Sequence, residues 1–565
     1  MTRVLPFGAA VLLLAAAAIA QDPSGGRGFP RDARQQASAT GTAIIRGRVV
    51  AADSGAPIRR AQVRALANDT RGSRLASTDG QGRFELRDLS AGRWELTASK
   101  AGFVTLRLGQ RRPFEPGKPV ELRDGQVVEG ADIALPRGAA ITGRVFDEFG
   151  DPVAGARVQV LRYQFLQGIR RLRPTGIGDQ SDDTGAFRLF GLTPGDYYVS
   201  ATVRALPVDD PTVDSAGYAP TYYPGTGNVA EAQRVTVGVG QELASVSFAL
   251  LPVRTVRVSG RAIDSMGQPL GGGVATLTPA DATADTPMMF GGGGNVRQDG
   301  TFTLTNVAPG SYTLTVASRP FGRRGGRGGD SDGEVGSIPL TVANEDLSGI
   351  QIATTQGATV SGVVVAAQGS STALRTAGIQ ITTQPVPFSR GPGTGMTRVE
   401  STGAFTLTGL LGSRVIRVSG LPQDWMLQSI VVNGADVADR ILEFSGNQEV
   451  RGVRVIVTDR VTEVNGTVTA AGRPARDYTV VVFPEDTAKW TFPSRHLRSG
   501  RPDQQGLFRI RALPPDERYL AAAVDYLEEN EAMDPQFLEH IKTSATRFAL
   551  GEGETRALEL KLVER

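Results

Sequence analysis

One short pattern occurs five times along this chain and constrains its fold more than any other feature of the sequence. A phenylalanine is followed two positions later by Leu or Ile and five positions later by Leu or Val, and a glycine stands two positions before it. Alternate residues share one face of a β-strand, and the glycine permits the positive φ of a tight turn. The pattern predicts a hairpin strand with one buried face in each repeat. Its anchors are Phe84, Phe187, Phe302, Phe405 and Phe508.

A second motif, G-x-V or G-x-A, precedes each anchor by 37 to 44 residues, and each repeat ends in a short alternating run such as GADIAL or VSFAL. The repeats are about 95 to 115 residues long, with around seven short strands separated by Gly, Pro, Asp and Asn turns. This organisation predicts an all-β protein, a tandem array of five transthyretin/immunoglobulin-like seven-stranded antiparallel β-sandwiches. Five sandwiches in a row would form an extended string of beads.

The repeat divides the chain into segments. We expect a signal peptide over 1–20, a flexible lead-in over 21–41, and sandwiches over 42–136, 137–252, 253–355, 356–459 and 460–565. The last sandwich also contains a predicted short helix. Asp534 is its N-cap, Pro535 takes the first helical position, and Phe537, Leu538 and Ile541 share one face.

The N-terminus has the pattern of an export signal. Arg3 precedes an apolar run, and Ala18 and Ala20 form an A-x-A site before Gln21. The apolar run of this signal is too short for a comfortable membrane span, and no later segment approaches 18 consecutive apolar residues, so we expect no transmembrane segment. The chain has no cysteine, which excludes a lipid anchor and disulfides. We expect an exported protein that is periplasmic, on the cell surface or secreted.

The first repeat carries a family resemblance. The stretch IRGRVVAADSGAPIRRAQVRAL, followed by TDGQGRFELRDLSAGRWELTASKAGF, is similar to the carboxypeptidase regulatory-like domain, a transthyretin-like sandwich of the starch-binding-like class. The stretches YAPTYYPG (218–225) and those within 461–541 resemble exported bacterial multi-repeat proteins of that family. The resemblance implies a fold and an export route, and it implies no reaction.

The residues needed for familiar catalytic chemistry are scarce. The only two histidines, His496 and His540, lie 44 positions apart and form no zinc-binding motif. There is no G-x-S-x-G element, and the acidic turns at Asp182, Asp183 and Asp299 match no calcium-binding loop. We therefore expect no catalytic residues, no metal, no cofactor and no enzyme.

Five aromatic residues are the candidate ligand-binding residues: Tyr218, Tyr222, Tyr223, Trp425 and Trp490. Flat aromatic faces on loops can stack on sugar rings, so these residues predict a carbohydrate site. The alternative is that they pack their loops onto a domain. An arginine-glycine stretch at 319–333 could bind polyanions, but its position between two strands favours a hairpin loop, and export removes it from nucleic acid.

These observations favour a non-catalytic extracytoplasmic binding or scaffolding protein. Its expected partners are a polysaccharide or another cell-envelope protein, with no nucleic acid. The alternatives are a carbohydrate-binding protein that uses the loop aromatics, or an accessory subunit of an exported peptidase or outer-membrane receptor. The sequence leaves the oligomeric state open.

Overall fold

The computed structural model describes residues 41–67, 72–112, 114–203, 216–279, 293–318, 333–386, 395–490 and 492–564. The predicted signal peptide, nearly all of the lead-in and nearly all of the arginine-glycine stretch lie outside these residues. Within them the chain is all-β, with one α-helix, α1 (Pro535–Lys542), and three short 3-10 helices. No helix in the described part is long and apolar enough to cross a membrane.

Five sandwiches follow one another, and we number them domains 1 to 5 with the limits given above. In domain 1, β1 lies between antiparallel β4 and parallel β8 and β9, and a second sheet has the order β3-β2-β5-β6 with β7 also on β5. The strands of domain 1 are β1 (Ala43–Ala51), β2 (Gln62–Ala67), β3 (Ser73–Ser77), β4 (Arg83–Leu89), β5 (Gly92–Ser99), β6 (Leu106–Arg107), β7 (Val120–Leu122), β8 (Val127–Val128) and β9 (Ile133–Leu135).

Domains 2 and 3 repeat this arrangement. Domain 2 contains β10 (Ala139–Phe146), β11 (Arg157–Leu166), β12 (Ile169–Gln180), β13 (Ala186–Leu192), β14 (Gly195–Thr202), β15 (Ala216–Tyr218), β16 (Thr221–Tyr222), η1 (Val229–Glu231), β17 (Val235–Val237), β18 (Glu242–Leu243) and β19 (Phe248–Ala249). Domain 3 contains β20 (Pro252–Arg254), β21 (Val256–Ile263), β22 (Gly273–Pro279), β23 (Gly293–Val296), β24 (Thr301–Val307), β25 (Gly310–Ser318), β26 (Glu334–Val342), β27 (Leu347–Ala353) and β28 (Thr355–Gln356). The short strands β20 and β28 cross the predicted limits between domains.

Domains 4 and 5 add elements to the same frame. Domain 4 contains β29 (Ala358–Ala366), β30 (Gln380–Pro385), β31 (Met396–Arg398), β32 (Ala404–Leu410), β33 (Gly412–Ser419), β34 (Met426–Val432), β35 (Ala435–Asp436), β36 (Leu442–Phe444) and β37 (Glu449–Thr458). Domain 5 contains β38 (Glu463–Ala470), β39 (Arg473–Pro474), β40 (Thr479–Pro484), η2 (Thr487–Lys489), β41 (Arg498–Gly500), β42 (Phe508–Arg511), β43 (Glu517–Val524), η3 (Glu531–Met533), α1, β44 (Thr546–Leu550) and β45 (Thr555–Val563).

The two sequence motifs of each repeat are direct cross-strand partners. Gly47 pairs with Phe84, and the equivalent glycine pairs with the equivalent phenylalanine in the other four domains. The reason for glycine is close packing, because a Cβ atom on Gly143 would lie 2.0 Å from the backbone oxygen of Val246. All five phenylalanines are buried, and each belongs to a separate apolar core.

Two details differ from the expected sandwich. The sheets are mixed, since the first strand of each domain pairs in parallel with one or two strands near the end of the domain, as β21 does with β27. A parallel pair needs a long crossover, and the intervening strands of the second sheet supply it. Domain 1 also has nine strands, because short pieces such as β6 and β8 pair separately.

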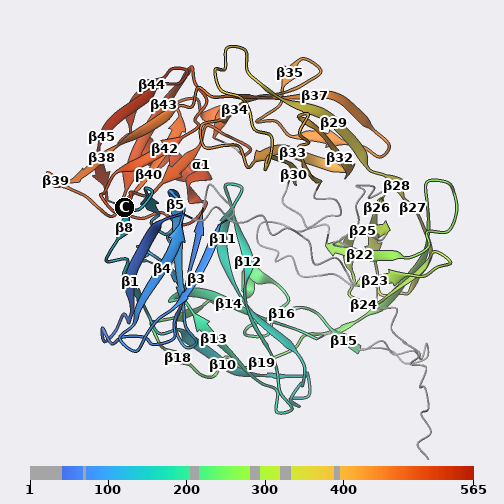
Figure 1. Cartoon of the computed structure of the whole chain (residues 1–565). Helices are drawn as coiled ribbons and strands as arrows, with labels where there is room; N and C mark the ends of the chain where they lie inside the picture. The colour runs from blue at the N-terminus through green and yellow to red at the C-terminus, as the bar shows by residue number, and fades with distance from the viewer. Residues whose placement is uncertain are drawn as a thin grey trace, which may run out of the picture.

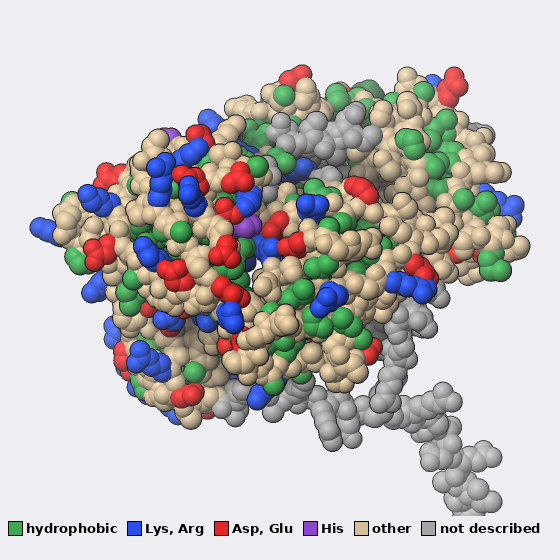
Figure 2. Space-filling view, turned by 90° about the horizontal axis from the view of Figure 1, so that it is seen from above, with side chains coloured by type: hydrophobic (Ala, Val, Ile, Leu, Met, Phe, Trp, Pro, Cys, Tyr) green, Lys and Arg blue, Asp and Glu red, His purple; other side chains and the backbone are tan. Residues whose placement is uncertain are grey.

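The five sandwiches form a closed ring instead of the expected string of beads (Figure 1). Domains 1 and 5, at opposite ends of the chain, lie side by side, and their ion pairs are described below. Charged side chains of both signs gather over the left part of the molecule in Figure 2, where domain 5 lies, and the right part carries fewer. Ring closure brings together residues that are hundreds of positions apart.

Candidate functional site: the contact between the first and last domains

The connection between β6 and β7 in domain 1 is the main docking element. We call residues 107–121, apart from 113, the docking loop. Its own backbone bonds hold it in shape: Lys118 N donates to Leu108 O at 2.7 Å, and Leu108 N donates to Leu96 O at 2.9 Å. Within the loop, the backbone N–H groups of Arg111 and Arg112 donate to Glu115 Oε2 at 3.1 and 3.2 Å. The Glu115 carboxylate is therefore oriented by domain 1 itself.

Glu115 meets Arg501 of domain 5 in a buried ion pair. Arg501 Nη1 lies 2.8 Å from Glu115 Oε1, and the two side chains are 1% and 2% exposed. The same nitrogen donates to Pro116 O at 2.8 Å, and Arg501 Nη2 binds Asp477. Two charges buried this deeply lose much of their hydration, so the multiple partners are needed to offset that cost. The contact is therefore specific in geometry.

Ion pairs at the rim surround this buried pair. In most of these pairs domain 1 supplies the cation and domain 5 the carboxylate. In the Glu121–Arg509 pair, at 3.0 Å, domain 1 supplies the carboxylate and domain 5 the cation. The Gln504 amide exchanges two hydrogen bonds with the backbone of Glu121, at 2.9 and 3.3 Å. The remaining pairs are Arg107–Glu529 (3.5 Å), Arg111–Asp477 (2.9 Å), Arg112–Asp525 (2.9 Å) and Lys118–Asp477 (3.0 Å). Exposed pairs contribute little individually, and here they fix charge complementarity.

Burial affects the titration of the docking loop lysine. Desolvation lowers the pKa of Lys118, and the hydrogen bond and charge of Asp477 oppose that shift. The ammonium group also donates to the backbone oxygen of Arg476. This lysine is one of only five in the chain. It serves as a structural cation at the interface.

Domain 2 joins the contact through Arg162. Its guanidinium lies over the ring of Phe114 from domain 1 and pairs with Glu528 of domain 5 at 3.1 Å. The Arg162 side chain is 8% exposed, and desolvation lowers its pKa. Nearby, burial followed by the charge of Glu528 raises the pKa of Tyr526 to about 12. Three domains thus meet at one buried cation.

The long β11–β12 hairpin of domain 2 extends to domains 4 and 5. Gln167 and Gly168 at its tip have φ values of 52° and 76°, as a two-residue type I′ turn requires. Gln167 Nε2 donates to Pro385 O in domain 4 at 3.4 Å. A Cβ atom on Gly168 would lie 2.3 Å from Met533 O in domain 5, so only glycine allows this approach.

Domain 4 binds domain 5 through Arg495. Its Nε donates to Asp439 at 2.8 Å, its Nη2 to Asp436 at 3.0 Å, and its backbone N–H to the other Asp439 oxygen at 2.8 Å. Asp436 lies in the extra hairpin β34–β35 of domain 4, and Asp439 follows that hairpin. His496, next in sequence, has its Nε2 3.7 Å from Asp439.

The predicted carbohydrate-binding aromatics lie in three different domains and form no common platform. Tyr222, Trp425 and Trp490 are 4%, 5% and 3% exposed. Trp490 donates to Pro484 O at 2.8 Å and packs edge-on against Phe483. Such burial leaves these three rings no free face for a sugar. Tyr218, whose hydroxyl donates to Glu148 at 2.8 Å, and Tyr223 are half-buried against the domain 2 core.

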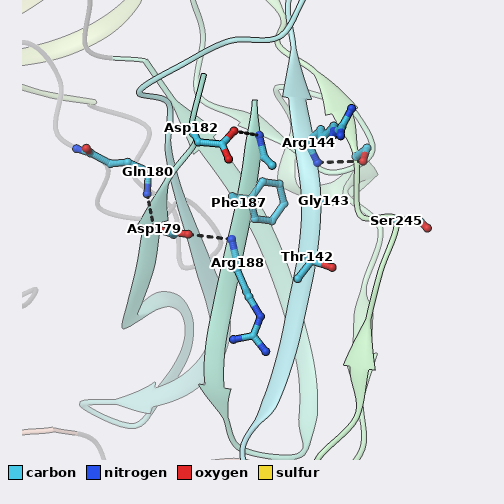
Figure 3. Close-up of a pocket in the computed structure, with 11 residues that line it drawn as sticks. Thr142, Gly143, Arg144, Asp179, Gln180, Asp182, Phe187, Arg188 and Ser245 are labelled. Atoms are coloured by element: carbon cyan, nitrogen blue, oxygen red, sulfur yellow. Dashed lines mark hydrogen bonds between the residues drawn. The ribbon is translucent and has the colours of Figure 1, made fainter. Parts of the chain in front are cut away.

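A hollow of about 580 Å³ lies on domain 2 beside β10 and β13 (Figure 3). Its carboxylates are already used: Asp182 Oδ1 accepts the backbone N–H groups of Thr184 and Ala186 at 2.9 Å, and Asp179 Oδ2 accepts that of Arg188 at 2.8 Å. The hydrogen bond from the Thr184 hydroxyl, followed by those from the backbone N–H groups of Ala186 and Thr184, lowers the pKa of Asp182. The turn prediction for Asp182 is confirmed.

Comparisons with known proteins agree with part of this description. Residues 44–136 match the sequence profile of the carboxypeptidase regulatory-like domain, which confirms the resemblance predicted for domain 1. No curated protein sequence matches the chain.

Solved structures with some similarity include surface proteins of Gram-positive bacteria. A streptococcal ancillary pilin is 12% identical, over 55% of this chain and 98% of the pilin, with a TM-score of 0.20. The minor pilin of Streptococcus agalactiae is 14% identical, over 38% and 97%, with a TM-score of 0.22. The Bacillus anthracis TIE protein is 13% identical, over 70% and 68%, with a TM-score of 0.14. Scores this low carry no argument about this chain.

Proposed function

We propose that the protein is a non-catalytic extracytoplasmic scaffold that holds five sandwich domains in a closed ring. The observation that carries the proposal is the buried Glu115–Arg501 pair, which joins the two ends of the domain array. A string of independent modules would have no reason to bury complementary charges between its first and last members. Closure gives every loop on the ring a fixed position relative to the others, as a scaffold requires.

Two further observations support a non-catalytic role. The described residues contain no group of three or more His, Asp or Glu side chains that could hold a metal. The acidic residues around the domain 2 hollow bind backbone N–H groups of their own turns. We infer that the partner is another cell-envelope protein, because charged side chains of both signs gather over domain 5 (Figure 2) and the five candidate aromatics, which lie in three different domains, form no common platform.

Small-angle X-ray scattering of the mature chain tests ring closure. With a radius of gyration of about 13 Å per domain, five domains in a ring give roughly 30 Å and a straight row gives roughly 50 Å. We expect the wild type near the first value. Arg501→Glu, which places a second carboxylate against Glu115, should move it toward the second value. Arg473→Glu, at an exposed site in the same domain, is the matched control. A wild type near 50 Å would refute the closed scaffold.

Export is tested separately. The full chain, expressed in a Gram-negative host, should appear in the osmotic-shock fraction, with the mass of a chain whose first residue is Gln21. A chain retained in the cytoplasm with its first residues intact would contradict the extracytoplasmic part of the proposal.

A further inference from the structure

Both halves of the ring-closing contact are built before they meet. On the domain 1 side, the N–H groups of Arg111 and Arg112 fix Glu115 without help from domain 5. On the domain 5 side, Arg501 is paired with Asp477 of its own domain. Because neither surface needs the other to take shape, docking has a small reorganisation cost. Two preformed surfaces can dock whether they belong to one chain or to two chains.

The contact is also polar enough to separate. Its direct bonds are ion pairs and hydrogen bonds, made by four cations and two carboxylates of the docking loop. When the ring opens, these charged and polar groups regain their hydration. Polar inter-domain contacts of this kind resemble transient protein–protein interfaces. Both open surfaces would remain soluble.

The two surfaces differ from each other, so the contact is heterologous. A heterologous contact closes into a ring or continues from one molecule to the next, and here the chain supplies both surfaces. We propose that the ring-closing contact also forms between chains, so that domain 1 of one copy docks on domain 5 of a second copy of this chain. This inference rests on the proposed closed scaffold, because it uses the same contact.

The balance between the two arrangements depends on effective concentration. Within one chain, domain 5 is present near domain 1 at a high effective concentration. The concentration of a second copy in dilute solution is lower than this. The closed monomer therefore dominates in dilute solution. Any condition that opens the ring makes both surfaces available to neighbouring copies, and the product is a head-to-tail assembly.

Two single variants separate these possibilities. Arg501→Glu keeps a native domain 1 surface and spoils domain 5, and Glu115→Arg keeps a native domain 5 surface and spoils domain 1. In both chains, closure would bury like charges at this contact while the Arg162–Glu528 pair is unchanged, so we expect the domain 1 and domain 5 surfaces to separate. In an equimolar mixture, domain 1 of the first variant meets domain 5 of the second with every native contact present.

Sedimentation velocity at about 100 μM protein, a concentration suited to micromolar contacts, is the measurement. We expect each variant alone to be monomeric and the mixture to double in weight-average mass, with the gain lost in high salt because screening weakens exposed ion pairs. A mixture that stays monomeric overturns the inference, even where scattering shows a closed wild type. Should the reversed variants lose their circular dichroism signal, Arg501→Gln and Glu115→Gln replace them, and the same two outcomes decide.

Discussion

Domains 1 and 5 share the same sandwich of strands, but they differ in how many faces of their sheets are buried. In domain 1, strand β2 alternates between buried and exposed residues, as expected for a sheet with one face in water. In domain 5, all six residues of β40 are buried, and β43 is buried over its last six residues. A second apolar cluster, which includes Trp490, Phe537, Leu538 and Ile541, covers the outer face of this sheet. Domain 5 therefore has three layers where domain 1 has two.

The added layer also contributes several of the contacts that domain 5 makes with its neighbours, in addition to those of Arg501, Asp477, Gln504 and Arg509. Arg495 binds domain 4, Asp525 and Glu529 bind domain 1, and Glu528 binds domain 2. All four residues lie in or beside the segments that cover the second sheet, outside the motifs that the repeats share. The comparison shows that the repeated frame makes the domains and that unshared segments supply part of their arrangement, while Gln504 and Arg509 of the repeated hairpin also contact domain 1.

The largest expected effect comes from removing an anchor of the third layer. Phe537→Ala empties space in a packed cluster and should lower the free energy of unfolding of domain 5 by about 3 to 5 kcal/mol. Leu75→Ala in domain 1 is the control, since that side chain is 65% exposed and its loss should change stability by at most about 0.5 kcal/mol. Urea unfolding followed by tryptophan fluorescence measures both. Equal effects at the two sites would show that the third layer adds no stability.

A smaller effect is expected at the contact between domains 4 and 5. Arg495→Ala removes the guanidinium that binds both Asp439 and Asp436, and hydrogen bonds to charged groups of this kind are worth about 1.5 to 3 kcal/mol. Calorimetry should then show domain 5 unfolding at a lower temperature, with the transition of domain 1 unchanged. Arg440→Ala, at an exposed residue beside Asp439, should leave the curve as it is. A shift of the same size for Arg440→Ala would show that Arg495 has no specific role in the contact between domains 4 and 5.

The sequence predicted the shared frame well because that frame depends on local rules. The Phe, Leu and Gly spacing fixed the strand faces and turns, and Asp534, Pro535 and the apolar face of the helix were all identified correctly. The parallel last strand was missed, because alternation gives the faces of a strand and not its direction. In the acidic turn that contains Asp182 and Asp183, Asp182 is the residue that accepts the backbone hydrogen bonds of the turn.

The ring-closing contact could not be predicted from the sequence. Glu115 and Arg501 are 386 positions apart, and neither lies in a periodic pattern. The only available signal was negative: the charged run RLGQRRPFEPGKP has no equivalent in the other repeats. The five candidate aromatics were expected to be exposed, Tyr218, Tyr222 and Tyr223 because their segment is rich in Gly and Pro, whereas Trp425 and Trp490 fill apolar clusters that the β-strand pattern does not reveal.

Domain 5 also differs from the other domains in the backbone of its parallel strand pair. In domains 1 to 4, a residue with positive φ interrupts this pair: Gly130, Ser245, Gly349 and Gly452. In domain 5, the pair is uninterrupted, with Ala557 at the equivalent position. Ser245, at φ 81°, is the one side chain in this strained conformation. Ser245→Gly should stabilise domain 2 by about 1 kcal/mol.

Gly349→Ala is the matched test of the same strain. A Cβ atom there meets nothing within 4 Å, so the cost comes from the backbone alone and should be about 1 to 2 kcal/mol in domain 3. Ala557→Gly in domain 5 relieves no strain and should not stabilise. Thermal unfolding of the three variants measures these changes. Stabilisation by Ala557→Gly as large as that by Ser245→Gly would mean that domain 5 shares the strain after all.

The smallest expected effect is a dependence of domain 5 stability on pH. His496 lies between domains, with Asp439, Glu517, Lys489 and Arg495 around it. Its Nδ1 faces the Tyr519 hydroxyl at 3.1 Å, and because that hydroxyl donates to Pro514 O, Nδ1 carries the proton. Burial is the largest influence and lowers the pKa of His496, so the folded state favours the neutral ring.

The sign of the pH effect follows from this shift. The unfolded chain, with an ordinary histidine pKa near 6.5, takes up a proton before the folded chain does. Stability is therefore complete above that value and falls as the pH drops below it, until the folded histidine is protonated as well. His496→Gln should flatten urea unfolding midpoints between pH 7 and 5, and His540→Gln, at the exposed second histidine, should not. If His540→Gln flattened the profile and His496→Gln did not, the pH response would belong to the outer surface of the third layer and not to the contact between domains.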